Sequence, residues 1–282
     1  MHADGTLAEG PVALCEVQAY VYAAKKCAAQ LARTLGNINL SSELEQSAAE
    51  LRTRFDETFW CEELSTYALA LDGNKDLCRV RSSNPGHCLF TGIAPADHAR
   101  RVAETLMQES SFSGWGIRTL DSGEVRYNPM SYHNGSVWPH DNAMIAAGFS
   151  DYGFKPHAAR LLSALFDLSQ SVHLNRLPEL LCGFSRRPSQ GPTLYPVACA
   201  PQAWAAGAVF MALRACLGMK IDGAAHSVCF EHPTLPQFLS ELHIRNLRIG
   251  SSLLDLTFHR YPDNVGVNVD RRSTPVQIMV LK

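Results

Sequence analysis

The fold is decided first by the stretch Val12–Gly36, VALCEVQAYVYAAKKCAAQLARTLG. Its apolar residues recur at spacings of three and four, which is the period of one face of an α-helix. Gly36 follows the last apolar residues, a position typical of glycine just beyond a helix C-terminus. The stretch therefore predicts a helix over residues 12–36.

The same periodicity predicts five further helices. Ser42 is expected to cap the second one, because a serine hydroxyl accepts from free N–H groups and acidic residues follow it in the first turn. A proline begins each of the other four, and proline is tolerated in the first turn of a helix. The predicted ranges are 42–60, 95–108, 139–152, 156–174 and 201–217, with a short strand at 66–71.

After Lys220 the apolar pattern changes from helical periodicity to alternation. Pairs such as Leu242 and Ile244 are separated by polar neighbours, which is the pattern of a half-buried strand. Three or four antiparallel strands are expected, with a β-bulge at Asn246 where the alternation breaks. The sequence therefore predicts a mainly α fold, with a helical domain at 1–220 and a small β element at 221–282.

Composition excludes several classes of protein. The 282 residues carry 25 basic and 27 acidic side chains, so the net charge of −2 gives no case for binding nucleic acid or an anionic membrane. No apolar run is long enough for a transmembrane helix, and the N-terminus does not have the pattern of a signal peptide. The nine cysteines are odd in number and include no C-x-x-C pair, which favours reduced thiols in a cytoplasmic protein.

The stretch Tyr127–Asn142, YNPMSYHNGSVWPHDN, is the richest in chemistry. Its aromatic, amide, histidine and carboxylate side chains are the mixture that binds a sugar, whose C–H face packs on rings while its hydroxyls need hydrogen bonds. The alternative is a loop in which His140 and Asp141 merely cap a helix. The spacing between His133 and His140 matches no zinc signature, so no metal site is expected.

Three other stretches offer candidate site residues. Glu179 lies among apolar residues, where desolvation favours the acid form and suits acid–base catalysis, although a salt bridge to Arg176 is an equal alternative. Trp115, which lies between two glycines, and the nearby Arg118 suit the wall of a cleft. Gln202 and Trp204 begin a helix, and burial in the core is the alternative for both tryptophans.

Taken together, these stretches resemble the C-terminal portion of the glycogen-debranching (amylo-alpha-1,6-glucosidase) family of six-hairpin glycosidases. The matching pieces follow one order along the chain: EVQAYVYAA at 16–24, ALALDG at 68–73, SNPGHCL at 83–89, SGWGIRTL at 113–120, YNPMSYHNGSVWPHDNA at 127–143, RLPELLCGF at 176–184 and YPVACAPQAWAAG at 195–207.

The resemblance implies an (α/α)6 toroid of twelve helices that hydrolyses an α-glucosidic bond, in this family an α-1,6 branch. Related barrels invert the anomeric centre with a general acid and a general base, and this chemistry needs no cofactor. The substrate implied is an oligosaccharide or glucan. By the same resemblance Glu179 is the general base, and the substrate-binding residues are Gln18, Trp115, Arg118, His133, Trp138, His140, Asp141, Asn142, Gln202 and Trp204.

The sequence departs from the family pattern in two respects. Only six helices are predicted, about half of the toroid, and the family segment with the general acid precedes the part that resembles His2–Gly10. Within this chain Asp141 is the one candidate acid. Two functions are therefore expected to compete: a glycosidase or a fragment of one, and a non-catalytic carbohydrate-binding or assembly subunit. The second would need a missing N-terminal half or a second copy to complete the barrel.

Overall fold

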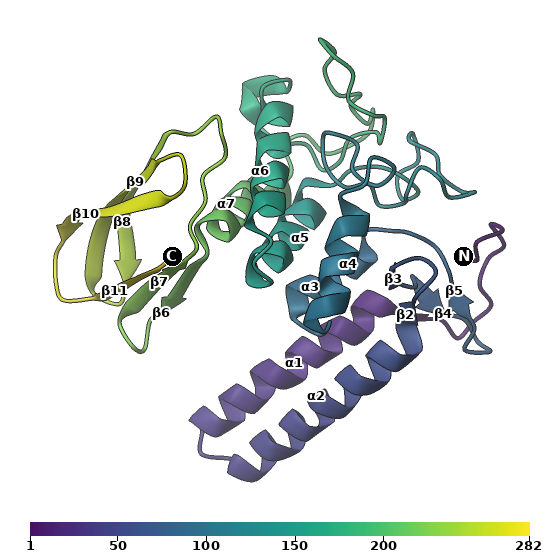
Figure 1. The fold of residues 1–282 in the computed structure, drawn as a ribbon, viewed down its shortest axis with the longest axis horizontal. Coiled ribbons are helices and arrows are strands. Elements are labelled where there is room, and N and C mark those ends of the chain that lie inside the picture. Colours follow the sequence, from purple (N-terminus) through teal and green to yellow (C-terminus); the bar gives the residue numbers. More distant parts are fainter.

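A computed structural model describes residues 1–282 and contains seven α-helices (Figure 1). None of them combines the length and apolar character that a membrane span requires. Their bounds are α1 (Cys15–Thr34), α2 (Ile38–Phe59), α3 (Asn84–Thr91), α4 (Ala96–Leu106), α5 (Pro139–Asp151), α6 (Lys155–Ser169) and α7 (Ala203–Leu217), with a short 3-10 turn at His173–Asn175.

The helices α1 and α2 form an antiparallel hairpin (Figure 1). Gly36 adopts φ +81°, a left-handed conformation that glycine adopts without steric cost, and turns the chain. Asn37 then caps α2, because its side chain accepts from the backbone N–H of Leu40. The expected cap at Ser42 is therefore wrong, and α2 begins four residues earlier, at Ile38.

Helix α3 was not expected from the sequence. It has eight residues, too few to show a period, and Pro85 and Gly86 in its first turn resemble a turn signal. Its end is marked by Gly92, which adopts φ +75° as a left-handed C-cap.

Four helices form a row in which each contacts the next: α1, α3, α5 and α7. Helix α2 packs on α1, while α6 packs on α5 and α7. One apolar core joins these helices, and its largest buried side chains include Phe55, Phe149 and Ile145. Six of the nine cysteines are buried as free thiols, whereas Cys27 and Cys199 are exposed.

Helix α5 lies unusually close to α3. A Cβ atom at Gly148 of α5 would lie 2.6 Å from the backbone nitrogen of Phe90, and one at Gly86 of α3 would lie 2.5 Å from Cγ1 of Ile145. Both distances are shorter than a van der Waals contact, so only glycine permits this approach. The approach matters because it fixes the spacing of side chains at the N-terminal ends of the two helices.

Five two-residue strands lie at the end of the hairpin where α1 begins and α2 ends (Figure 1). They form one three-stranded and one two-stranded antiparallel sheet. The single strand expected at 66–71 is two separate strands, β3 and β4, in different sheets. The bounds are β1 (Ala13–Leu14), β2 (Trp60–Cys61), β3 (Thr66–Tyr67), β4 (Ala70–Leu71) and β5 (Leu77–Cys78).

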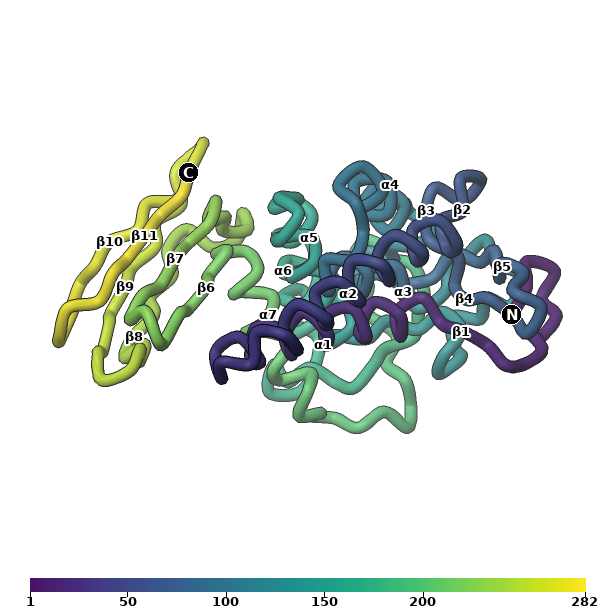
Figure 2. The backbone as a smooth tube through the Cα atoms, turned by 90° about the horizontal axis from the view of Figure 1, so that it is seen from below, coloured from purple at the N-terminus to yellow at the C-terminus, as the bar shows by residue number.

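The C-terminal region contains six strands in two three-stranded sheets. A separate apolar core lies in this region, and within it Phe230 and Phe258 meet edge to face. Figure 2 shows these strands gathered at one end of the molecule, opposite the N-terminus. The strands are β6 (Met219–Asp222), β7 (Ser227–Glu231), β8 (Glu241–Ile249), β9 (Ser252–Arg260), β10 (Val265–Arg272) and β11 (Gln277–Leu281).

The bulge expected at Asn246 is confirmed. The register of β8 against β9 shifts between Ile244 and Leu247, and Asn246 adopts φ 56°. The expectation of only three or four antiparallel strands is wrong, because β6 and β11 flank β7 in a second sheet and β11 pairs with β7 in parallel. The division of the chain after residue 220 stays a prediction.

The fold class expected from the sequence is wrong. The chain is not a mainly α, incomplete (α/α)6 toroid of about six helices with a small β element. It is a mixed α/β chain with seven helices and four sheets, about 38% helical and 21% strand. The difference arises because two-residue strands and strands that pair over long sequence separations leave little periodicity in the sequence.

Alanine substitutions at two helix glycines should have opposite effects on the free energy of unfolding, because only one of the two glycines lies at the close contact between α5 and α3. Gly148→Ala forces a methyl group against the backbone of α3 and should lower the free energy of unfolding by about 1–3 kcal/mol. Gly207→Ala is the matched control, because no atom lies within 4 Å of its Cβ position in α7. It should raise that free energy by about 0.5–1 kcal/mol. Urea unfolding measures both, and a neutral Gly148→Ala would contradict the packing.

Candidate active site

A pocket of about 440 Å³ lies where the N-terminal ends of α1, α3, α5 and α7 meet. Each helix contributes side chains from its first two turns, and loop residues complete the wall. The lining residues are Glu16, Tyr20, Ser83, Asn84, His87, Thr119, His133, Trp138, His140, Asp141 and Trp204.

A buried pair of a histidine and an aspartate joins α3 to α5 at this pocket. Nε2 of His87 lies 2.5 Å from Oδ1 of Asp141, and Nδ1 of His87 lies 2.6 Å from the hydroxyl of Tyr20 on α1. Both side chains of the pair are nearly buried, with 12% and 10% of their surface exposed. The pair thus ties three of the four helices together beside the pocket.

The two partners hold each other in their charged forms. Burial by itself lowers the pKa of His87, but the hydrogen bond and charge of Asp141 outweigh burial and raise it above its ordinary value. Burial likewise raises the pKa of Asp141, but the hydrogen bond and charge of His87, with smaller contributions from the Ser83 side chain and the charge of His140, bring it below its ordinary value. Asp141 is therefore a carboxylate at neutral pH.

Two polar atoms at the wall of the pocket have no partner within the protein. They are Oδ2 of Asp141 and Nδ1 of His140, both buried. A buried polar atom without a hydrogen bond is costly, and a ligand hydroxyl is one group that would satisfy it. These atoms mark where a polar ligand would be recognised.

Aromatic rings form the other side of the pocket. The ring of Trp204 stacks on His140 with centroids 4.2 Å apart, and 48% of Trp204 is exposed. The ring of Trp138 meets His140 edge to face and donates its indole N–H to Ser136. An exposed ring beside unpartnered polar atoms suits a ligand with both an apolar face and hydroxyl groups, such as a sugar.

Glu179 lies next to this aromatic group. Its Oε1 accepts from the hydroxyl of Tyr132 at 2.8 Å, and its Oε2 accepts from the backbone N–H of Cys199 at 3.2 Å. The ring of Tyr132 packs edge to face on Trp138, which borders the pocket. Glu179 is therefore held beside the pocket by a rigid set of contacts.

The charge state of Glu179 differs from the expectation. The hydrogen bonds from Tyr132 and Cys199, with a further one from Gln202, lower the pKa of Glu179 below its ordinary value. The expected preference for the acid form is therefore wrong, because hydrogen bonds to the carboxylate outweigh desolvation. The alternative of a salt bridge with Arg176 is wrong as well, since no ion pair joins them.

Three expected binding residues lie away from the pocket lining. The buried guanidinium of Arg118 donates to the carbonyls of Gly183, Glu109 and Ser110. The buried amide of Asn142 binds both backbone groups of Ile117. The ring of Trp115 lies under the guanidinium of Arg186. Arg118 and Asn142 thus hydrogen-bond to backbone groups near the pocket, and none of the three residues lines it.

Of the other expected residues, some line the pocket and others lie outside its lining. His133 is exposed and borders the pocket together with Trp138, His140, Asp141 and Trp204. Gln202 caps α7 and hydrogen-bonds to Glu179, whereas Gln18 on α1 is half-buried and does not border the pocket. No group of three or more His, Cys, Asp or Glu side chains is arranged to hold a metal ion.

Sequence reasoning missed Glu16, Tyr20 and His87. The signal was available, since Tyr20 and His87 lie in the stretches EVQAYVYAA and SNPGHCL. The contact of these residues with Asp141 could not be predicted, because α3 itself was not predicted.

The fold is shared with solved proteins. The mannosylglycerate hydrolase of Thermus thermophilus, a GH63 protein solved with Tris, has a TM-score of 0.58 and 23% identity, covering 71% of this chain and 45% of that one. A protein described as a sialidase has a TM-score of 0.70 and 12% identity, covering 95% of this chain and 26% of that one.

Residues 2–182 match the family model described as the mannosylglycerate hydrolase MGH1-like glycoside hydrolase domain, and the chain belongs to this family. The mannosylglycerate hydrolase MGH1 of Selaginella moellendorffii is 30% identical over 80 residues, 28% of this chain and 16% of that protein. The chain thus spans less than half the length of these relatives. The expected membership of a glycoside hydrolase family is confirmed, but the family is named for mannosylglycerate hydrolases rather than for debranching enzymes.

The contacts of Glu179 predict the effect of removing one hydroxyl. Tyr132→Phe deletes the donor to Oε1, so the pKa of Glu179 should rise toward its ordinary value. Tyr195→Phe is the control, because Tyr195 packs on Tyr132 without a hydrogen bond to Glu179. An NMR titration of the Glu179 carboxyl carbon measures both, and an unchanged midpoint in Tyr132→Phe would contradict the assigned contact.

Proposed function

We propose that this chain binds the terminal hexose of an α-linked glycoside in the pocket and hydrolyses the glycosidic bond, with Glu179 as the general base. One observation carries the proposal: unpartnered polar atoms and an exposed tryptophan ring lie next to an ionised, hydrogen-bonded carboxylate. Membership of a glycoside hydrolase family supports the same interpretation.

In the binding step the ring of Trp204 covers the C–H face of the hexose. The carboxylate of Asp141 accepts from sugar hydroxyls through Oδ2, which has no protein partner. His140 offers its unpartnered Nδ1 to the same hydroxyls. These groups orient the ring before any bond is broken, which is a large part of how such sites lower a barrier.

In the hydrolytic step Glu179 removes a proton from a water molecule, and the water oxygen bonds to the anomeric carbon. The bond to the leaving oxygen breaks at the same time, and that oxygen takes the bonding electrons and a proton from a solvent water molecule. Attack from the opposite face inverts the anomeric centre. Glu179 suits the base role because Tyr132 and the N–H of Cys199 keep it ionised and oriented.

Asp141 is assigned here to binding rather than to protonation of the leaving group. A general acid must hold a proton when the bond breaks, and the contact with His87 lowers the pKa of Asp141. This assignment replaces the acid role expected for Asp141 from the sequence.

The identity of the hexose is part of the proposal. The relatives are mannosylglycerate hydrolases, and a Thermus thermophilus structure of this kind was solved with glucose. The debranching resemblance favours an α-1,6-linked glucose. We therefore propose a neutral hexose of the glucose or mannose series in the pocket, and mannosylglycerate and panose as the substrates that separate the two alternatives.

The assay that tests Glu179 uses α-glucosyl fluoride and α-mannosyl fluoride, because fluoride leaves without help from a general acid. Glu179→Gln should reduce fluoride release by about 100-fold or more, as expected for loss of a general base. Glu63→Gln is the matched control, since Glu63 is an exposed glutamate outside the pocket. Equal rates in Glu179→Gln and the unmodified chain would overturn the assignment.

The same assay separates catalysis from binding alone. NMR of the first product should show the β-anomer, and an α-anomer would contradict inversion. If the chain binds hexose but releases no fluoride, the non-catalytic carbohydrate-binding alternative is correct. If it neither binds nor hydrolyses, the proposed function is wrong.

A further inference from the structure

We propose that His87 and Tyr20 are positioning residues for sugar recognition: they hold the Asp141 carboxylate ionised and fixed at the pocket wall, so that its second oxygen accepts from the bound hexose. This inference rests on the proposed function, since it names the groups that prepare one of its binding residues.

The geometry of the contacts fixes both oxygens of the carboxylate. Oδ1 of Asp141 lies 2.5 Å from Nε2 of His87, so this oxygen is held by the imidazole. The imidazole is itself anchored at Nδ1 by the Tyr20 hydroxyl, 2.6 Å away. A ring held at both nitrogens cannot rotate, and it therefore fixes the direction of the carboxylate. Oδ2 is left as the acceptor without a protein partner.

The charged and titratable groups around Asp141 come from three helices. Helix α1 presents Glu16 and Tyr20, helix α3 presents His87, and α5 itself presents His140, which also feels the charge of Glu179. His87 is the main group that keeps Asp141 ionised despite burial, with smaller contributions from the Ser83 side chain and the charge of His140. Burial and the charge of Asp141 raise the pKa of Tyr20 to about 12, which keeps its hydroxyl protonated.

Five buried side-chain atoms of the chain have no hydrogen-bond partner, and the two that belong to residues lining the pocket are Oδ2 of Asp141 and Nδ1 of His140. Burying an acceptor without a partner costs free energy, and the second oxygen of Asp141 is buried at the rim of a pocket. The cost is accounted for if a ligand hydroxyl completes the set. His87 and Tyr20 then serve recognition by preparing the acceptor in advance.

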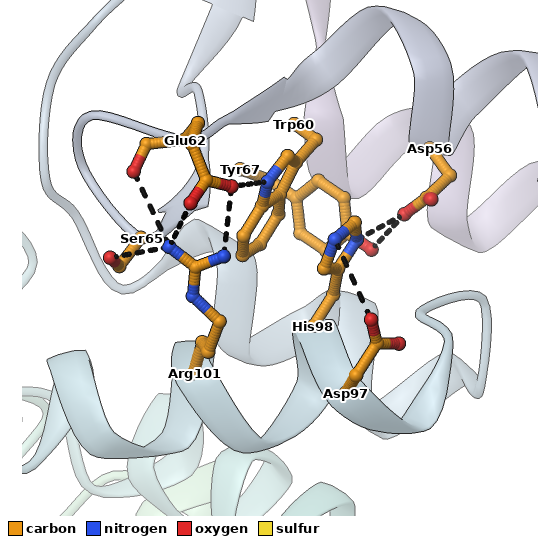
Figure 3. A network of polar contacts seen from close by, with 8 residues as sticks. All are labelled: Asp56, Trp60, Glu62, Ser65, Tyr67, Asp97, His98 and Arg101. Carbon is orange, nitrogen blue, oxygen red and sulfur yellow. Dashed lines mark hydrogen bonds and ion pairs between the residues drawn. The ribbon is translucent and has the colours of Figure 1, made fainter.

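A second histidine–aspartate pair in the chain provides a matched control. Figure 3 shows His98 of α4 beside Asp56 of α2, with Nδ1 of His98 2.8 Å from Oδ1 of Asp56. The ring of His98 stacks on Trp60 at 3.6 Å, and the Tyr67 hydroxyl donates to the same Asp56 oxygen at 2.7 Å. This pair repeats the chemistry of His87 and Asp141, but neither residue borders the pocket.

The experiment measures the affinity for methyl α-mannoside and methyl α-glucoside by tryptophan fluorescence, from acidic to neutral pH. His87→Ala should weaken binding by at least about tenfold at neutral pH, since it leaves a buried carboxylate without its hydrogen-bond partner. His87→Gln keeps a donor without the charge and should recover part of the affinity. As the pH is lowered, both variants should lose binding at a higher pH than the unmodified chain does, because Asp141 takes up a proton more readily without the charge of His87.

Tyr20→Phe should weaken binding less than His87→Ala, since it removes only the anchor of the ring. His98→Gln should change neither the affinity nor the pH at which binding is lost. A circular dichroism spectrum and a melting curve for each variant separate misfolding from a binding defect. Folded His87 variants with unchanged affinity and an unchanged pH of loss would overturn the proposal.

One further readout separates this inference from the proposed function. NMR titration of the His87 ring in the ligand-free chain should show a pKa that falls in Asp141→Asn. If the unmodified chain binds neither methyl glycoside, the proposed function is overturned. If the His87 titration is unchanged in Asp141→Asn, the pair itself is overturned, whether or not sugar binds.

Discussion

The close contact between α3 and α5 is the constraint on which the rest of the site depends. Gly86 and Gly148 carry no Cβ, so the two helices approach closely enough for His87 and Asp141 to form a short hydrogen bond. A larger side chain at either position would separate the helix ends. The contact between His87 and Asp141, and with it the charge of Asp141, depends on this approach.

The position of the pocket in the fold also favours negatively charged side chains there. The N-terminal ends of four helices meet there, and a helix N-terminus carries a partial positive charge. Glu16 and Asp141 lie in the first turns of α1 and α5, where that charge favours carboxylates. Asp141 and Glu179 are both kept ionised, but by different means: a buried imidazole in one case and neutral hydrogen-bond donors in the other.

Much of the helical part could be predicted from sequence, because α1, α2, α4, α5, α6 and α7 are long enough to show a period or begin at a proline. The bulge at Asn246 also left a visible break in alternation. Helix α3 and the pairing of the two-residue strands were not predictable, since these elements are too short to show a period and the strands depend on partners distant in the chain.

The chemistry of the site was partly visible in the sequence. A stretch rich in polar and aromatic residues marked the right loop, but it could not show which side chains border the pocket. Arg118 and Asn142 satisfy buried backbone groups instead, while His87 was missed because its partner lies on another helix. Local composition identifies a functional loop, whereas the contacts within it are set by the tertiary structure.

The central claim is that a sugar binds where α1, α3, α5 and α7 meet, and the four tryptophans of the chain test it directly. Trp138 and Trp204 border the pocket, whereas Trp60 and Trp115 do not. In a titration with methyl α-mannoside or methyl α-glucoside, the indole N–H signals of Trp138 and Trp204 should shift together. Those of Trp60 and Trp115 should stay in place. A titration in which Trp115 or Trp60 shifts while Trp138 and Trp204 do not would contradict the account.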